Sequence, residues 1–236
     1  MIGARTTGFA RRIYLWVTLV PSGHMSSNLI VCVSTDVEGA LLRPYLPVLV
    51  TGVGAVNAAI ALTRFLERNA GTSAIFSCGI GGAYPGSGLP LATAVWASSE
   101  CYGDLGADSP DGFLDMEAIG FPVIAGTPRF YNRLPVSLYP TTETRSFVTV
   151  NTCTGDDERA LAIAARTGGA VESMEGAAIA HVALLYGIPS GEVRGVSNPA
   201  GNRDRSIWRV KEAAAAAQSA LLQAWRLGEL SVPFKE

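Results

Sequence analysis

Short, continuous apolar runs alternate along the chain with longer stretches in which apolar residues recur at helical spacing. An apolar run of about four to eight residues is typical of a buried strand, whereas a longer amphipathic stretch favours a helix. The pattern predicts strands at residues 29–33, 47–51, 74–78, 93–99, 147–151 and 192–197, with a further short one that ends at Glu172. It predicts one helix that ends near Asn69, others over residues 156–167, 177–185 and 206–227, and a long loop over residues 100–120.

Strands and helices that alternate along a chain indicate an α/β fold. We therefore expect a single domain in which helices flank a central, mixed, largely parallel, twisted sheet. The domain is expected to span residues 28–228, followed by a tail at residues 229–236. The apolar run at residues 13–20 follows several arginines and resembles a signal peptide, but no A-x-A-like cleavage site follows, and the run is too short to cross a bilayer. Residues 1–27 are therefore interpreted as a disordered N-terminal extension.

The segment over residues 170–204 carries most of the candidate chemistry. The predicted helix at residues 177–185 is so apolar that most of its sides must be buried. Glu175 stands just before it, where the free N–H groups and the dipole of a helix stabilise a carboxylate. The next strand ends at Ser197 and Asn198. Ligands of open α/β sheets bind at such strand ends, so this segment is the first candidate for a binding site.

Composition narrows the functional classes. The chain has 236 residues, of which 48% are hydrophobic and 16% charged, and its net charge is −2. These values fit a compact soluble protein and give no reason to expect nucleic acid or an anionic membrane as a partner. Two histidines and widely spaced cysteines argue against a metal site, so neither a metal nor a cofactor is expected. The cysteines are interpreted as buried thiols in a reducing cytoplasm: Cys32, Cys78, Cys101 and Cys153.

Two stretches carry a family resemblance. VESMEGAAIAHVA, which begins at Val171, resembles the V-E-M-E-A-A-A motif of the purine nucleoside phosphorylase and nucleosidase family. RGVSNPAGNRD, which begins at Arg194, resembles that family's R-x-[IV]-S-[DN] motif. The form with asparagine, followed by G-x-R-D and Trp208, looks most like the futalosine hydrolases of the menaquinone pathway. The resemblance covers roughly residues 28–227 and implies a nucleoside phosphorylase-like fold and an N-glycosyl hydrolase.

The resemblance also implies which residues would hold the substrate. In the family the Met–Glu pair, here Met174 and Glu175, holds the ribose, and the glutamate binds its hydroxyls. The turn after the third strand contacts ribose and purine, which singles out Ile80 and Gly81. Ser197 belongs to the second motif and is expected beside the base.

The attacking group is expected to be water. In nucleosidases of the family, a glutamate after the first strand orders and deprotonates the attacking water, and Glu38 matches it. Phosphorylases keep an arginine that holds phosphate at the end of a strand. The matching position is Phe76 or Ser77, and neither side chain can neutralise a phosphate dianion. Without the resemblance, Glu38 would be interpreted as a solvated loop or first-turn acid.

Asn198 is expected to select the base. The last residue of its motif faces N7 of the purine, and in adenine-specific members it is aspartate. An asparagine side chain donates N–H but passes on no proton, so it favours a 6-oxopurine such as hypoxanthine. Asp204 would supply the missing acid or brace Asn198, and Arg203 would meet the carboxylate of futalosine's benzoate arm. A surface ion pair between Arg203 and Asp204, and a turn role for Asn198 before Pro199, remain open.

Three further features have plainer interpretations. His181 is expected to be a satisfied core histidine and Trp208 a core or interface residue. Gly52-Val53-Gly54 nearly matches a dinucleotide-binding fingerprint, but the third glycine is replaced. The family has a similar stretch after its second strand, so the glycines are interpreted as a tight turn beside the site.

The sequence thus predicts hydrolysis of futalosine to hypoxanthine and dehypoxanthine futalosine, with a small-molecule nucleoside as the ligand. The family also implies a homo-oligomer, either a dimer or a hexamer. Two alternatives remain open. The chain would be a nucleosidase for methylthioadenosine, S-adenosylhomocysteine or aminofutalosine, or a purine-binding protein without catalysis.

Overall fold

The strands of the central sheet come from the whole length of the chain. The structure is a computed structural model that describes residues 28–140 and 143–230. The expected N-terminal extension (residues 1–27) and residues 231–236 of the expected tail lie outside the described part. The strands are β1 (Leu29–Val33), β2 (Val48–Val50), β3 (Ala74–Ala83), β4 (Ala94–Tyr102), β7 (Arg133–Pro135), β8 (Thr144–Thr149), β9 (Val171–Ser173) and β10 (Ser190–Pro199).

The sheet closes on itself at one end. Its strand order is β10-β4-β8-β9-β3-β1-β2, and β10 also pairs with β3, so five of the strands form a ring from which β1 and β2 extend. Among the described strands, five of the eight pairings are parallel. The prediction of a mixed, largely parallel sheet is therefore confirmed, although the sequence pattern did not indicate the closure.

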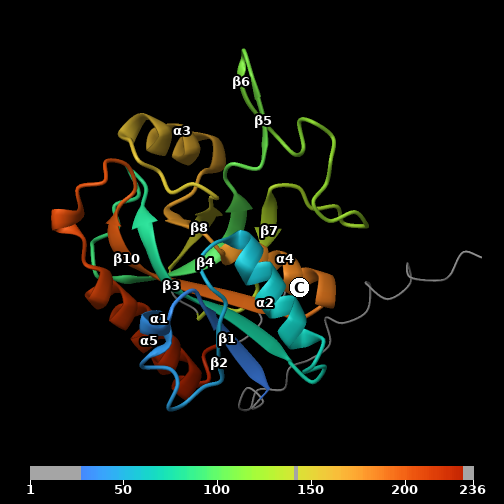
Figure 1. Cartoon of the computed structure of the whole chain (residues 1–236), viewed down its shortest axis with the longest axis vertical. Coiled ribbons are helices and arrows are strands. Elements are labelled where there is room, and N and C mark those ends of the chain that lie inside the picture. Colours follow the sequence, from blue (N-terminus) through green and yellow to red (C-terminus); the bar gives the residue numbers. More distant parts are fainter. Residues whose placement is uncertain (1–27, 141–142, 231–236) are drawn as a thin grey trace, which may run out of the picture.

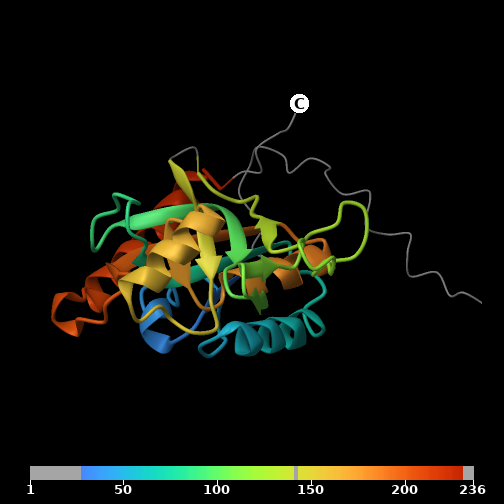
Figure 2. The same cartoon turned by 90° about the horizontal axis from the view of Figure 1, so that it is seen from above.

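Helices cover both faces of β1 and β3. The helices are α1 (Asp36–Gly39), α2 (Ala55–Leu66), α3 (Asp157–Thr167), α4 (Gly176–Tyr186) and α5 (Val210–Leu227). α2 and α4 pack side by side on one face, as Figures 1 and 2 show, and α5 packs against the other. Alternate residues of β1 explain why both faces are covered. Ile30 and Cys32 pack under α2 and α4, whereas Val31 and Val33 belong to the core beneath α5.

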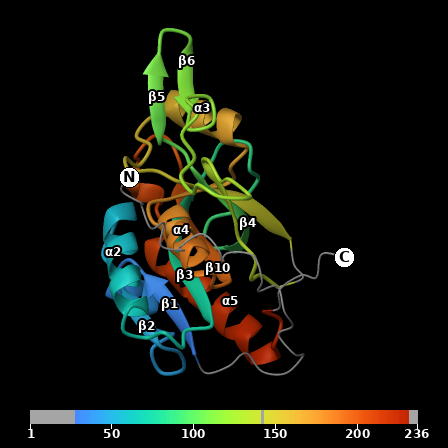
Figure 3. The same cartoon turned by 90° about the vertical axis from the view of Figure 1, so that its right-hand side faces the viewer.

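The region after β4 differs from the prediction of a loop over residues 100–120. β4 continues to Tyr102, and a hairpin of β5 (Gly106–Ser109) and β6 (Gly112–Asp115) follows. The hairpin projects from the body of the molecule (Figures 1 and 3), and Phe113 packs beneath the guanidinium of Arg166 at 4.3 Å. An exposed, polar hairpin lacks the alternation of apolar residues that reveals a half-buried strand, so the prediction was wrong here.

The last helix begins later than predicted. α5 begins at Val210 rather than at Ser206, and Arg205–Ile207 form a short 3₁₀ turn (η1) instead. Trp208 has extended backbone angles (φ −70°, ψ 136°), which separate this turn from α5. Ile207, which lies outside α5, is 45% exposed, while Ala217 and Leu221 within α5 are buried.

None of the helices within the described ranges is both long and apolar enough to cross a membrane.

Candidate active site

The carboxyl ends of β1, β3 and β10 meet at one edge of the sheet because these strands run parallel. α1 follows β1 directly, and Gly79 to Gly82 form the last part of β3. This topology brings Glu38, Ile80 and Ser197 to the same edge although they are far apart in sequence. Open α/β sheets bind their ligands at such an edge.

Arg194 of β10 lies at the centre of this edge and is 1% exposed. Its Nε donates to Glu192 Oε1 at 2.7 Å, and its Nη1 lies 3.4 Å from Glu175 Oε2. Its Nη2 donates to Ser77 Oγ at 2.9 Å, and Nη1 also faces the carbonyl of Ile80 at 3.3 Å. Burial alone would lower the pKa of Arg194, but the surrounding carboxylates, Glu192 first, outweigh it and raise this pKa. The guanidinium therefore stays charged and is held by buried partners.

Glu175 occupies the N-cap position of α4. Its Oε2 faces Arg194, and its Oε1 accepts a hydrogen bond from the backbone N–H of Gly54 at 2.9 Å. Gly54 has φ +98°, a conformation that favours glycine, so its N–H can approach the carboxylate. The glycine turn predicted beside the site thus contacts Glu175 directly.

Glu38 connects the end of β1 to the end of β3. Its Oε2 accepts hydrogen bonds from the backbone N–H of Thr35 at 3.0 Å and from the Thr35 hydroxyl at 2.9 Å, which completes a capping box for α1. Its Oε1 accepts from the backbone N–H of Ile80 at 3.0 Å. The carboxylate is buried, so the interpretation as a solvated loop acid does not apply to Glu38.

Gly79 separates Glu38 from Arg194. A Cβ atom at Gly79 would lie 2.5 Å from Glu38 Oε1 and 2.6 Å from Arg194 Nη1. Any larger residue would push the carboxylate and the guanidinium apart. The glycine therefore allows these two groups to approach the same point at the end of β3.

Met174 lies beside Cys153, which belongs to the loop after β8. Its Sδ is 3.2 Å from Cys153 Sγ. Burial raises the pKa of Cys153, and the nearby guanidinium of Arg203 opposes that rise. Arg203 also stacks over the ring of Trp208, 5.2 Å from its centroid. Cys153 is half-buried, so the expectation of four buried thiols holds for the other cysteines but not for this one, which follows β8 in a loop. Cys153 thus has both Met174 and Arg203 as neighbours, and a role for Arg203 at the substrate's tail stays a prediction.

Ser197 and Asn198 lie over the end of β3. Ser197 Oγ is 3.1 Å from the carbonyl oxygen of Gly81 and 2.7 Å from Asn198 Oδ1. Asn198 Nδ2 donates to the carbonyl of Pro199 at 2.8 Å and lies 3.3 Å from the position of a Cβ atom at Gly82. A side chain at Gly82 would therefore crowd the amide of Asn198.

Asp204 lies on the exposed loop before α5. Its Oδ1 accepts hydrogen bonds from the backbone N–H and the hydroxyl of Ser206, at 3.0 and 2.7 Å, and so caps η1. These bonds, that of the hydroxyl first, lower the pKa of Asp204. A general acid needs a raised pKa, so in this arrangement the carboxylate is better suited to shaping the loop than to protonating a base.

The two plainer interpretations agree with the contacts of their residues. His181 is half-buried, and its Nδ1 lies 3.2 Å from the hydroxyl of Tyr102. Burial lowers the pKa of His181, as expected for a neutral packed ring. Trp208 is half-buried and has the guanidinium groups of Arg203 and Arg205 over its ring.

Sequence reasoning missed the residues that hold this site together. The sequence marks Arg194 and Glu192 only as parts of a motif and a strand, and Ser77 only as a residue unable to bind phosphate. The sequence does contain a sign of this ion pair. Glu192 and Arg194 are charged residues two positions apart in a predicted buried strand, so their side chains lie on the same face of it. Buried charges of opposite sign on one face indicate an ion pair.

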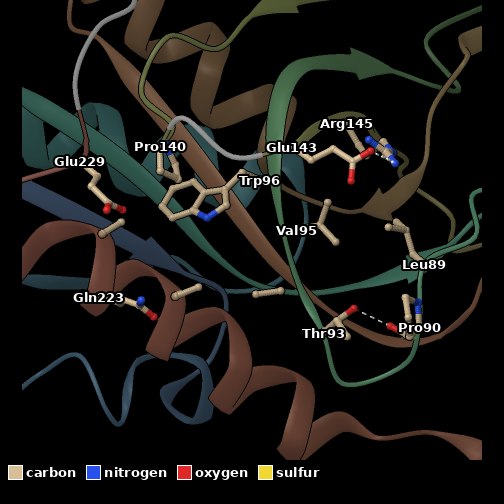
Figure 4. A pocket seen from close by; sticks show the side chains of 13 residues that line it. Leu89, Pro90, Thr93, Val95, Trp96, Pro140, Glu143, Arg145, Gln223 and Glu229 are labelled. Carbon is tan, nitrogen blue, oxygen red and sulfur yellow. Dashed lines mark hydrogen bonds and ion pairs between the residues drawn. The ribbon is translucent and has the colours of Figure 1, made fainter. Parts of the chain in front are cut away.

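Two hollows of the surface contain none of the predicted site residues. Figure 4 shows one of about 430 Å³, where Trp96 and Pro140 lie near Glu229 and where Glu143 pairs with Arg145. Within residues 28–140 and 143–230, no cluster of three or more His, Cys, Asp or Glu side chains has an arrangement that would hold a metal ion.

Comparison with known proteins decides the family. Residues 45–226 match the sequence profile of the Phosphorylase superfamily. The chain belongs to this superfamily. The resemblance seen in the two motifs is therefore confirmed.

Individual members of the superfamily that match this chain have more specific activities in their names. A futalosine hydrolase of Thermus thermophilus is 39% identical over 175 residues, which cover 70% of this chain and 75% of the relative. A futalosine hydrolase of Streptomyces coelicolor is 35% identical over 159 residues, 64% of this chain and 67% of the relative. Among solved structures, a methylthioadenosine/S-adenosylhomocysteine nucleosidase of Colwellia psychrerythraea in complex with adenine matches with a TM-score of 0.70 at 18% identity, covering 90% of this chain and 100% of that one. The nucleoside phosphorylase-like fold is thereby confirmed.

Gly79→Ala tests the packing of the site. The added methyl group would overlap Glu38 Oε1 and Arg194 Nη1. We expect it to lower the free energy of unfolding by about 1–3 kcal/mol, the usual cost of overpacking, as measured by urea denaturation. Gly71→Ala is the matched control, because a Cβ atom there would meet only Asn28 Nδ2, at an ordinary 3.6 Å. Equal effects of the two substitutions would contradict the close approach of Glu38 and Arg194 over Gly79.

Proposed function

We propose that this chain hydrolyses the N-ribosidic bond of futalosine, releases hypoxanthine and leaves dehypoxanthine futalosine for menaquinone biosynthesis. The carrying observation is the buried cluster of Glu38, Glu175 and Arg194 at the strand edge of a chain 39% identical to a futalosine hydrolase. Cleavage of an N-riboside passes through an oxocarbenium-like transition state. Such a reaction needs an aligned sugar, a nearby nucleophile and a stabilised leaving base.

Glu175 and Met174 form the ribose-binding part of the proposal. Oε1 and Oε2 of Glu175 are fixed by Gly54 N–H and Arg194 respectively, so the carboxylate has a defined orientation at the start of α4. A carboxylate that accepts hydrogen bonds from the ribose hydroxyls aligns the sugar and places negative charge near the developing cation.

Glu38 would orient and deprotonate the attacking water. Its carboxylate is fixed by Thr35 and by the N–H of Ile80, and only Gly79 separates it from Arg194. Phosphate is disfavoured as the nucleophile at this edge. The guanidinium of Arg194 is already engaged by Glu192 and Glu175, so an added dianion would meet carboxylates without a free cation to neutralise it.

Asn198 and Ser197 would face the base. The amide of Asn198 offers N–H to N7 and to a 6-oxo group, which favours hypoxanthine over adenine as the leaving base. Ser197 Oγ donates to Asn198 Oδ1 at 2.7 Å, and Asn198 Nδ2 donates to the carbonyl of Pro199. One N–H of the amide is therefore left for the base, and the second would reach it on release of the Pro199 bond. Asp204 caps η1, and its assistance to the base stays a prediction.

Arg203 would bind the acidic arm of the substrate. It is a neighbour of Cys153, which contacts Met174, and its guanidinium lies over the ring of Trp208. A guanidinium supported by an aromatic ring presents parallel N–H donors to a carboxylate. The aromatic part of a benzoate would then have Trp208 nearby as an apolar wall.

Assembly and location remain predictions from the family. We propose a homo-oligomer, a dimer or a hexamer, that acts in the cytoplasm on a small nucleoside and needs no cofactor.

The direct assay is release of hypoxanthine from futalosine in phosphate-free buffer and again with phosphate. We expect equal rates in both buffers, because water is the proposed nucleophile. Release of hypoxanthine from inosine and of adenine from methylthioadenosine should both be slower. Release that requires phosphate would identify a phosphorylase. Tight binding of hypoxanthine without turnover of any nucleoside would favour the purine-binding alternative.

Asn198→Asp tests the choice of base. An aspartate can accept from a 6-amino group and, when protonated, donate to N7, whereas it repels the 6-oxo group when ionised. We expect the ratio of kcat/KM for methylthioadenosine to that for futalosine to rise about tenfold or more. Asn69→Asp is the control, since Asn69 is exposed at the end of α2. An unchanged ratio would show that Asn198 does not select the base.

A further inference from the structure

A second pair of buried carboxyl groups lies behind Arg194. Glu100 of β4 is 0% exposed and Glu192 of β10 is 2% exposed. A Cβ atom at Gly176, the first residue of α4, would overlap both Glu100 Oε1 and Glu192 Oε2. The two carboxyl groups therefore converge on the same point beneath the start of α4, where only a glycine leaves room for them.

One carboxyl oxygen of Glu100 lacks a hydrogen-bond partner unless Glu100 carries a proton. Its Oε2 accepts from the backbone N–H of Cys101 and from the hydroxyl of Thr149, each at 3.1 Å. Its Oε1 is buried and has no hydrogen-bond partner among the described residues. A proton on Oε1 would provide the missing bond, since the neighbouring oxygens of Glu192 are acceptors.

Charge leads to the same conclusion. Two adjacent buried carboxyl groups do not both ionise readily, and the guanidinium of Arg194 is bonded to Glu192 rather than to Glu100. Burial, followed by the charge of Glu192, raises the pKa of Glu100 well above its ordinary value.

We propose that Glu100 is a protonated positioning residue whose Oε1–H donates to Glu192, and that this pair fixes the orientation of Arg194. Glu192 Oε1 in turn accepts from Arg194 Nε at 2.7 Å, which directs Nη1 of the guanidinium toward Glu175. Nothing in the two family motifs assigns such a role to Glu100. The effect of Glu100 on turnover rests on the proposed function, whereas the protonation of Glu100 does not.

The network begins and ends at the same helix terminus. The backbone N–H of Ala177 donates to Thr149 Oγ1 at 2.7 Å, and the Thr149 hydroxyl donates to Glu100. At the other end, Arg194 reaches Glu175, the N-cap of the same helix. The start of α4, which carries the proposed ribose-binding carboxylate, is thus held from both sides.

The charged and titratable groups around Glu100 are few. β10 contributes Glu192 and Arg194, and β4 itself contributes Cys101 and Tyr102. β8 contributes only the Thr149 hydroxyl, and α4 contributes backbone N–H groups. Burial raises the pKa of Tyr102, so the phenol stays neutral beside the pair.

Thermal unfolding of Glu100→Gln tests the proton without relying on catalysis. A glutamine is neutral at every pH, and its amide can donate to Glu192 while its oxygen accepts from Thr149. The raised pKa of Glu100 means that its contribution to stability is complete below the ordinary glutamate pKa of about 4.3 and is lost as pH rises toward the raised value. We expect the Tm of Glu100→Gln relative to the unchanged protein to rise by about 3 °C or more between pH 5 and pH 9.

Turnover of futalosine tests the positioning role. We expect Glu100→Ala to lower kcat about tenfold or more and Glu100→Gln to recover most of that loss. The decline of kcat at alkaline pH should move to higher pH in Glu100→Gln, because the glutamine has no proton to lose. Glu158→Gln, an exposed glutamate on α3, is the matched control and should change neither Tm nor kcat.

Two results would overturn the proposal. One is a Tm difference between Glu100→Gln and the unchanged protein that stays constant from pH 5 to pH 9. The other is a Glu100→Gln variant as slow as Glu100→Ala, which would mean that a negative charge is required. If the unchanged protein releases no hypoxanthine, the proposed function fails instead, and the Tm series alone still decides whether Glu100 carries a proton.

Discussion

The buried guanidinium of Arg194 is the constraint on which the candidate site depends. A charge removed from water costs several kcal/mol unless partners surround it, and here Glu192, Glu175 and Ser77 provide them. Ser77 lies on β3, Glu192 on β10 beside Arg194, and Glu175 at the start of α4, so these contacts also join the three elements. Loss of one partner from a buried pair typically costs about 3–5 kcal/mol, because the other charge is left unpaired. Stability and the geometry of the site therefore rest on the same contacts.

Glycines provide the space that these charged groups need. Gly79 lets Glu38 and Arg194 meet at the end of β3, and Gly54 offers its N–H to Glu175 in a conformation that other residues rarely adopt. Gly176 leaves room for the carboxyl groups of Glu100 and Glu192 beneath α4. Because these glycines have no side chain, the long side chains of Glu38, Glu100, Glu175, Glu192 and Arg194 can pack directly against the backbone. Four buried glutamates and one arginine therefore fit in one region of the sheet.

The sequence predicted the elements that leave a local pattern of apolar residues. It missed the contacts that form only when the sheet closes and distant strands pair. The apolar runs revealed β1, β3 and β10, and the all-apolar segment revealed α4, because burial on both faces leaves a continuous signal. The exposed hairpin after β4 left no such signal, and the pairing of β10 with both β3 and β4 is a long-range contact without a local signature. The family motifs pointed to Glu38, Glu175 and Asn198 as candidates. Arg194 and Glu100 were missed as site residues because their partners are known only once the strands are placed side by side.

The central claim is that the carboxylate of Glu38, held beside Arg194, activates water for attack on the ribose. Its most direct test is the kcat of Glu38→Gln for release of hypoxanthine from futalosine in phosphate-free buffer, with Glu158→Gln as the control. The amide keeps the size of the side chain but accepts no proton. The account predicts a fall in kcat of about 10²-fold or more with little change in KM, as expected for loss of a general base. A kcat within about twofold of the unchanged protein would contradict it.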